Sequence, residues 1–154
     1  MNTDFSSHKI EGWVPGKGPV SVPLISKVED NLYQGGCIGG VILPDYIDFI
    51  VSLYPWEKYT LLPGQSRQEI EMYDHGSMPD IDQLHQIADT VNTRRKESTV
   101  LVHCQAGLNR SGLVAALALI KSGMTPSEAI ALLRKSRCDM VLCNETFEAW
   151  LLKQ

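Results

Sequence analysis

The chain has 154 residues, of which 44% are apolar and 21% are charged, and its formal net charge is −4. This length fits one domain, and the composition excludes a disordered or collagen-like chain. The negative charge argues against a nucleic-acid binder, because such proteins present basic surfaces to phosphates. The longest apolar run, residues 113–120, is far shorter than the roughly 20 residues that span a bilayer, so no membrane segment is expected.

The N-terminus and the cysteines give expectations for the cellular compartment and for bound groups. The N-terminus lacks the basic start and apolar core of a signal peptide, which predicts a cytoplasmic protein. Four scattered cysteines have no CxxC spacing, so neither a disulfide framework nor a metal site is expected, and no cofactor is implied. Three of the cysteines are expected to pack as small apolar residues, with a disulfide to an oxidised Cys104 as the alternative: Cys37, Cys138 and Cys143.

The N-terminal part is rich in residues that disfavour regular structure. Residues 11–23 contain three Gly and three Pro, a composition that suits neither a helix nor a central strand. We therefore predict an extended arm over residues 1–24 and a folded domain over residues 25–154. Trp13 in the arm is expected to pack against that domain, because large aromatic residues are mostly buried; exposure to a partner is the alternative.

Short apolar runs in the first two thirds of the chain predict strands. They lie at residues 28–33, 47–53, 70–73 and 99–102. The runs do not alternate with polar residues, which is typical of a sheet that is covered on both faces. The run at 99–102 is rich in β-branched residues and predicts a central strand.

Helical patterns dominate the last half. Asp80 caps a predicted helix that ends near Arg95, and residues 111–120 predict a core helix that is apolar nearly all round. Two further helices are expected to begin after Thr125 and Asn144, which are good N-cap residues. Strands that come first and helices that come late predict an α/β fold.

The segment between the predicted central strand and the core helix has the layout of an anion-binding loop, with the sequence HCQAGLNRS over residues 103–111. Such a loop can turn its N–H groups inward, and the following helix directs its positive end to the same point. Gly107 permits a backbone conformation closed to other residues, and the Arg110 guanidinium can bind two phosphate oxygens at once.

Cys104 would lie at the base of this loop, where the N–H groups and Arg110 favour the thiolate. A thiolate that faces phosphate can attack phosphorus and form a cysteinyl-phosphate, which water then hydrolyses. Ser111 is placed to hydrogen-bond the sulfur when it leaves, and His103 is expected to be a buried residue that orders the loop. The alternative for Cys104 is a buried small apolar residue, but Arg110 at this depth needs an anion.

Residues 103–111 resemble the HC-x5-R-S signature of the cysteine-dependent protein tyrosine phosphatase superfamily. Residues 28–152 resemble a compact dual-specificity phosphatase, with supporting matches at 31–36, at Arg137 and at 144–147. The resemblance implies a central, mostly parallel twisted sheet flanked by helices. It also implies hydrolysis of phosphomonoesters without a metal, and makes residues 25–154 the catalytic domain.

The resemblance implies two sets of site residues. The catalytic set is Cys104, Arg110, Asp74 and Ser111, and the substrate-binding set is Gln105, Ala106, Gly107, Leu108, Asn109 and Arg110. Family members carry an acidic residue about 30 positions before the cysteine, and Asp74 lies 30 positions before Cys104. Asp80 and Asp82 are the alternatives, but the first fits a helix cap and the second a first helical turn. His75, which follows the expected acid, is interpreted as a solvated loop residue.

The expected substrate is a phosphoprotein that carries phosphotyrosine, with phosphoserine and phosphothreonine as further candidates. The loop interior has no Lys, whereas relatives that act on inositol lipids commonly have basic residues there. Three alternatives stay open: an RNA 5′-phosphatase, a phosphate-binding module with weak or no turnover, and thiol chemistry on another oxyanion such as arsenate.

Overall fold

The computed structural model describes residues 8–154, so the part of the predicted arm over residues 1–7 lies outside the described residues. Its core is a five-stranded sheet with the order β3-β4-β7-β5-β6. The strands are β3 (Ile25–Glu29), β4 (Leu32–Gly35), β5 (Phe49–Ser52), β6 (Ser66–Glu69) and β7 (Val100–His103). β3 is antiparallel to β4, and the other pairs are parallel, which confirms the predicted central, mostly parallel sheet.

Strand β7 is the centre of the sheet, as its β-branched sequence predicts. It pairs in parallel with β4 on one side and β5 on the other, and all four of its residues are buried. His103 is in register with Gly35 of β4 and with Ser52 of β5. The carboxyl ends of three strands therefore meet at one edge, which is where open parallel sheets bind ligands.

Two strand predictions need correction. The run at 28–33 is two strands, β3 and β4, because Asn31 adopts a positive φ of 64° and turns the chain between them. The strand predicted at 70–73 is wrong: Ile70 and Met72 are buried, but they lie in a loop, and the strand is β6 just before them. β6 is an edge strand of polar residues, so it carries no apolar pattern that could reveal it.

Three of the four helices begin where their capping residues predict, and the core helix begins one residue before its predicted start at 111. The four helices are α1 (Ile81–Arg94), the core helix α2 (Arg110–Lys121), α3 (Pro126–Ser136) and α4 (Glu145–Leu152). Asp80, Thr125 and Asn144 each accept a hydrogen bond from a first-turn N–H group. Within residues 8–154, no helix has both the length and the hydropathy that crossing a membrane requires.

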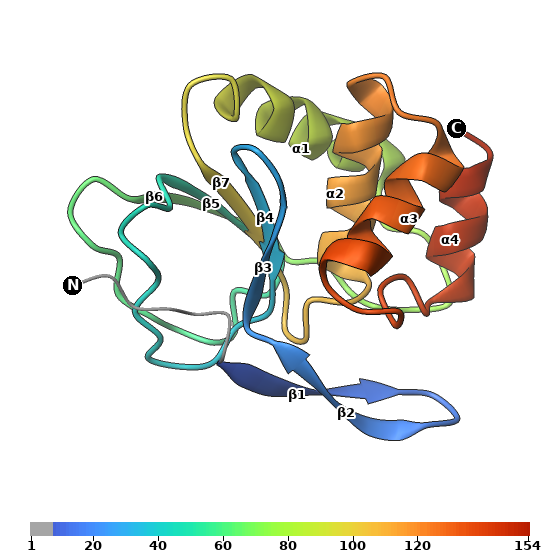
Figure 1. The fold of residues 1–154 in the computed structure, drawn as a ribbon, viewed down its shortest axis with the longest axis horizontal. Helices are drawn as coiled ribbons and strands as arrows, with labels where there is room; N and C mark the ends of the chain where they lie inside the picture. Colours follow the sequence, from blue (N-terminus) through green and yellow to red (C-terminus); the bar gives the residue numbers. More distant parts are fainter. Residues whose placement is uncertain (1–7) are drawn as a thin grey trace.

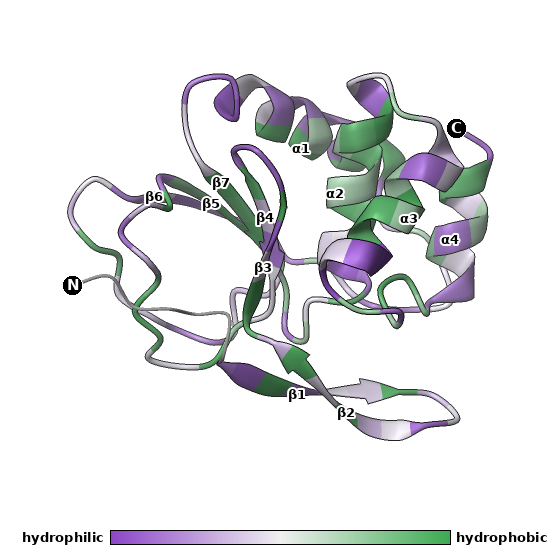
Figure 2. Cartoon of the chain, viewed as in Figure 1, coloured by the Kyte–Doolittle hydropathy of each residue, from purple (hydrophilic) through white to green (hydrophobic). Residues whose placement is uncertain are grey.

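The helices lie together on one side of the sheet, and the segments that join β4 to β5 and β5 to β6 lie on the other (Figure 1). Helix α2 is green over most of its length in Figure 2 because most of its residues are hydrophobic, and ten of its twelve residues are buried. It contacts α1, α3, α4 and the strands β4 and β7. Because α2 is enclosed in this way, whatever its first turn holds is fixed relative to the sheet.

The described part of the predicted arm is an antiparallel hairpin of β1 (Lys9–Val14) and β2 (Gly18–Pro23). Figure 1 places it beside the lower edge of the main sheet. The expectation that Trp13 packs inward is wrong, because 70% of its surface is exposed. Alternation along the strand explains this: Ile10 and Val14 face the body, so Trp13 must face outward.

The junction of hairpin, sheet and loop depends on Gly36. A Cβ at this position would lie 2.5 Å from the carbonyl oxygen of Gln105 and 2.2 Å from Cδ1 of Ile10. We expect Gly36→Ala to lower the free energy of unfolding by about 2 kcal/mol, because a backbone atom cannot move aside easily. Gly39→Ala, which meets no atom within 4 Å, should change it by less than about 0.5 kcal/mol. Urea denaturation of both variants measures the difference, and equal stabilities would contradict this account.

Candidate active site

The predicted loop joins the central strand to the most buried helix. We call residues 104–110 the anion loop; it leaves β7 at the carboxyl edge of the parallel strands and enters α2. Cys104 follows β7 directly, and Arg110 is the first residue of α2. Both side chains are buried, with 2% and 9% of their surface exposed. The two reactive groups predicted from the sequence thus lie at opposite ends of one short, fixed loop.

The carbonyl groups of the anion loop are held from outside it. Those of residues 105–108 accept hydrogen bonds from the N–H groups of Cys37 and Leu142 and from the side chains of Arg137 and Gln34. In the described part of the chain, no N–H group of residues 105–109 donates to a protein acceptor. These N–H groups are available to bind the oxygens of an anion, together with the start of α2.

Arg137 is the main support of this arrangement. Its Nε donates to the carbonyl of Gly107 at 2.7 Å, and Nη2 donates to that of Ala106 at 3.0 Å. Burial lowers the pKa of Arg137 to about 10, so the guanidinium is still charged at neutral pH. Gly107 has a φ of 75°, and a Cβ there would lie 2.5 Å from Nη2 of Arg137. No local pattern in the sequence reveals that Arg137 contacts a loop 30 residues earlier.

The Cys104 sulfur lies next to a hydroxyl group. Its Sγ is 3.4 Å from Oγ of Ser111, which lies one position inside α2. That Oγ also accepts a hydrogen bond of 3.1 Å from Nε2 of Gln34. As a thiol, Cys104 donates to this Oγ; as a thiolate it can only accept, and the Ser111 hydroxyl proton can then point at the sulfur because Gln34 already supplies a donor to the hydroxyl oxygen. Gln34 is a further site residue that the sequence analysis did not identify.

Arg110 is a buried cation without an acidic partner. Its Nη1 donates to the carbonyl of Met72 at 3.2 Å, and its guanidinium lies 5.1 Å from the ring centre of Tyr54. Its Nε is buried and has no hydrogen-bond partner, and none of the ion pairs among residues 8–154 includes Arg110. A buried charge is costly unless it is paired, so this geometry favours an anion in the loop.

Asp74 is held over the anion loop by two amide groups. Its Oδ2 accepts from Nδ2 of Asn109 at 2.9 Å, and its Oδ1 accepts from Nδ2 of Asn144 at 2.7 Å. Both amides were noted in the sequence, but not as partners of this carboxyl group. Asp80 caps α1, and Asp82 lies in the first turn of that helix. Of the three acidic residues considered from the sequence, Asp74 therefore lies at the anion loop, whereas Asp80 and Asp82 belong to the start of α1.

His103 is buried directly below the anion loop, as predicted. Its Nε2 lies 2.7 Å from the Tyr59 hydroxyl, and its Nδ1 lies 3.1 Å from the carbonyl oxygen of Cys104. Burial lowers the pKa of His103 to about 4, so the ring is neutral at pH 7. It can therefore orient the backbone at Cys104, but it adds no charge there.

A pocket of about 730 Å³ opens over the anion loop. Four predicted site residues of the loop line it: Gln105, Ala106, Asn109 and Arg110. Its walls come from the hairpin, from the 74–76 segment and from the start of α4. Leu108 and Gly107 do not line it, because both side-chain positions face the interior. These two residues can contribute only backbone groups to an anion.

The other cysteines differ from Cys104 in their surroundings. All four are free, and burial raises the pKa of Cys37 to about 12, which keeps it a neutral thiol. Cys143 lines the pocket and lies 3.4 Å from Nδ2 of Asn109. Across residues 8–154, no group of three His, Cys, Asp or Glu side chains could hold a metal ion.

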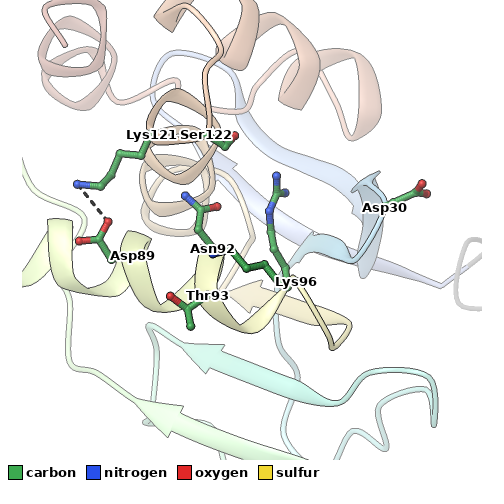
Figure 3. A pocket seen from close by; sticks show the side chains of 8 residues that line it. Asp30, Asp89, Asn92, Thr93, Lys96, Lys121 and Ser122 are labelled. Carbon is green, nitrogen blue, oxygen red and sulfur yellow. Dashed lines mark ion pairs between the residues drawn. The ribbon is translucent and has the colours of Figure 1, made fainter.

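A second hollow of about 600 Å³ lies near the far end of α2 (Figure 3). Its lining has both charges, and Lys121 pairs with Asp89 across it at 3.2 Å. The α2 helix rises about 1.5 Å per residue, so Lys121 is about 16 Å from Arg110 along the axis. None of its lining residues is a cysteine, and this hollow is separate from the anion loop.

The fold and the anion loop define a class of α/β proteins that present a cysteine and an arginine to one oxyanion. Residues 47–154 match the family model "Dual specificity phosphatase, catalytic domain". The chain belongs to this family, within the cysteine-dependent phosphatase superfamily, as the signature at residues 103–111 predicted. The match begins at residue 47, so the hairpin of β1 and β2 lies outside it.

Curated proteins that are similar to this chain in sequence are named as tyrosine phosphatases. Protein tyrosine phosphatase PRL-1 of Leishmania major is 34% identical over 91 residues, which are 53% of this chain and 51% of that protein. A tyrosine-protein phosphatase CDC14 homolog of Schizosaccharomyces pombe is 34% identical over 74 residues, 47% of this chain and 14% of that protein. The chain spans about half or less of the length of these relatives. The crystal structure of human DUSP28 has the same fold, with a TM-score of 0.68, 14% identity, and coverage of 85% of this chain and 94% of that one.

The depressed pKa of His103 predicts acid sensitivity. In the unfolded chain the His103 imidazole binds a proton near pH 6.5, whereas in the folded chain it does so only near pH 4. The free energy of unfolding therefore falls as the pH decreases from 6.5 to 4. We expect a contribution on the order of 3 kcal/mol from this group. His103→Gln should remove that part of the pH dependence in urea denaturation between pH 7 and 4.5. His75→Gln, at an exposed position, is the control, and an unchanged slope in His103→Gln would contradict the assignment.

Proposed function

We propose that this protein is a cysteine-dependent phosphatase that removes phosphate from phosphoproteins. The observation that carries the proposal is the buried, unpaired guanidinium of Arg110 on the loop that also holds Cys104. The free N–H groups of residues 105–109 supply further donors for a phosphate in the same place. Family membership and relatives named as tyrosine phosphatases support the same reaction.

In the first step, the Cys104 thiolate attacks phosphorus and displaces the oxygen of the substrate side chain. The leaving oxygen needs a proton, which Asp74 is placed to donate from above the loop. The charge on the transferred phosphoryl group is shared among the loop N–H groups and Arg110. The products of this step are the dephosphorylated side chain and a phosphorus–sulfur bond on Cys104.

In the second step, water attacks phosphorus, Asp74 accepts its proton, and the Cys104 sulfur leaves as a thiolate. The Ser111 hydroxyl at 3.4 Å can donate a hydrogen bond to the sulfur as its charge returns. Gln34 keeps this hydroxyl turned toward Cys104. The step releases inorganic phosphate and restores the enzyme, so no cofactor enters the balance.

The charges around the pocket favour a single phosphate on a protein. Among the described residues that line it, Arg110 is the one Lys or Arg side chain, whereas Asp74 and Glu145 are acidic. A polyanion such as RNA or an inositol polyphosphate would meet repulsion at this rim. We infer a phosphotyrosine substrate, with phosphoserine and phosphothreonine as candidates. We also assign the reaction to residues 25–154 and the protein to the cytoplasm, where Cys104 stays reduced.

Cys104→Ser tests the nucleophile. We expect wild type to hydrolyse para-nitrophenyl phosphate in EDTA, with a stopped-flow burst of phenolate if hydrolysis of the intermediate is slow. The variant should lose on the order of 10⁴-fold or more in kcat, because its hydroxyl is not ionised at neutral pH. Vanadate binding by the variant checks that the loop is intact. If wild type binds vanadate without turnover, the chain is a binding module and the proposal fails.

Asp74→Asn tests the proton donor. We expect about a 10²-fold loss in kcat on a phosphoserine peptide and a smaller loss on para-nitrophenyl phosphate, whose leaving group is stable as an anion. Wild type should follow a bell-shaped pH profile, since Cys104 acts ionised and Asp74 acts protonated. The variant should lose the decline at high pH. Asp82→Asn, on the surface of α1, should retain wild-type rates, and equal losses in both variants would rule out the assignment.

A further inference from the structure

The hairpin brings an exposed aromatic side chain to the rim of the catalytic pocket. Trp13 is 70% exposed, yet it lines the pocket together with Asp74 and Arg110. Its indole is supported across the hairpin, because a Cβ at Gly18 would lie 3.9 Å from two ring atoms. A large exposed aromatic residue beside an active site indicates a contact surface for a ligand.

The hairpin packs closely against the anion loop, which places the backbone of β1 beside the loop. A Cβ at Gly12 would lie 3.1 Å from Cβ of Ala106 and 3.4 Å from Cδ1 of Leu108. Ile10 and Val14, on either side along β1, are buried. This close approach turns the outward face of β1 into a wall of the pocket.

Aromatic and acidic residues also line this pocket. His75 lines the pocket and stacks on Tyr73, with ring centres 5.3 Å apart and an interplanar angle of 6°. Glu145, in the first turn of α4, lines the same pocket. An indole and a carboxylate that line the same pocket suit a cationic side chain, which the ring face attracts and the carboxylate pairs with.

We propose that Trp13 and Glu145 form a subsite for a Lys or Arg next to the phosphorylated residue of a polypeptide substrate. The proposal rests on the proposed phosphatase activity and adds a substrate preference to it. Arg110 binds the phosphate, and the acidic rim with Trp13 binds the neighbouring cation. The hairpin, outside the family match, is then a specificity element of this chain.

The test compares three phosphotyrosine peptides that differ only in the two flanking residues, which are Arg, Leu or Glu. Wild type should prefer the Arg peptide over the Leu peptide about fivefold in kcat/KM, and should disfavour the Glu peptide. Trp13→Ala and Glu145→Gln should each bring the Arg-to-Leu ratio close to one. Trp13→Phe should retain part of it, since a ring face remains. Tyr46→Ala, an exposed aromatic residue away from the pocket, should retain the full ratio.

The outcomes test the Trp13 and Glu145 subsite and the phosphatase activity separately. An Arg-to-Leu ratio of one in wild type, or a ratio unchanged in both Trp13→Ala and Glu145→Gln, would overturn the subsite. Faster turnover of a 5′-phosphorylated RNA than of the Arg peptide would overturn it as well. Failure of wild type to hydrolyse para-nitrophenyl phosphate would instead overturn the phosphatase proposal. Thermal denaturation of each variant separates a lost preference from a lost fold.

Discussion

Hydrogen bonds from Arg137 to the carbonyls of Ala106 and Gly107 are the constraint on which the active site depends. A short loop can surround an anion with N–H groups only if its carbonyl oxygens are held elsewhere, because a carbonyl that turned inward would repel the anion. Arg137 supplies charged donors for two of these carbonyls from a buried position on the far side of the loop. The N–H groups of residues 105–109 are thereby left available to bind the oxygens of an anion.

Two buried guanidinium groups, those of Arg137 and Arg110, contact this region in different ways. Each nitrogen of the Arg137 guanidinium has an acceptor, in the carbonyls of Ala106 and Gly107 and the Ser26 hydroxyl, and the group remains charged because burial lowers its pKa only to about 10. Arg110 is less satisfied, since its Nε has no partner and its Nη1 binds only a backbone carbonyl. The positive charge that holds the loop is thus distinct from the charge that is left without a partner for an anion. A preorganised site of this kind needs little rearrangement when phosphate arrives.

The sequence predicted the parts of the site that lie close together in the chain. Cys104, Arg110 and Ser111 lie on one loop and helix start, so a local pattern reveals them together with the strand and helix around them. Arg137 and Gln34 contact the loop from far along the chain, and contacts of that kind have no local pattern. The polar edge strand β6 was missed for a related reason. It is a strand because it pairs with β5, and its own side chains carry no apolar pattern. Trp13 was misplaced because average burial says nothing about which face of a hairpin is covered.

The network around Asp74 links the chemistry to the last helix. Asn144 both caps α4 and holds Asp74, while Asn109 joins the same carboxyl group to the anion loop. The backbone N–H of Asn144 also donates to Oδ1 of Asn109 at 2.8 Å. The Asp74 carboxyl group is therefore positioned by the anion loop and the start of α4, which are joined at Asn109, and not by its own exposed segment. This explains how a segment of small and polar residues can hold a carboxyl group in one place, because its rigidity comes from the partners to which it binds.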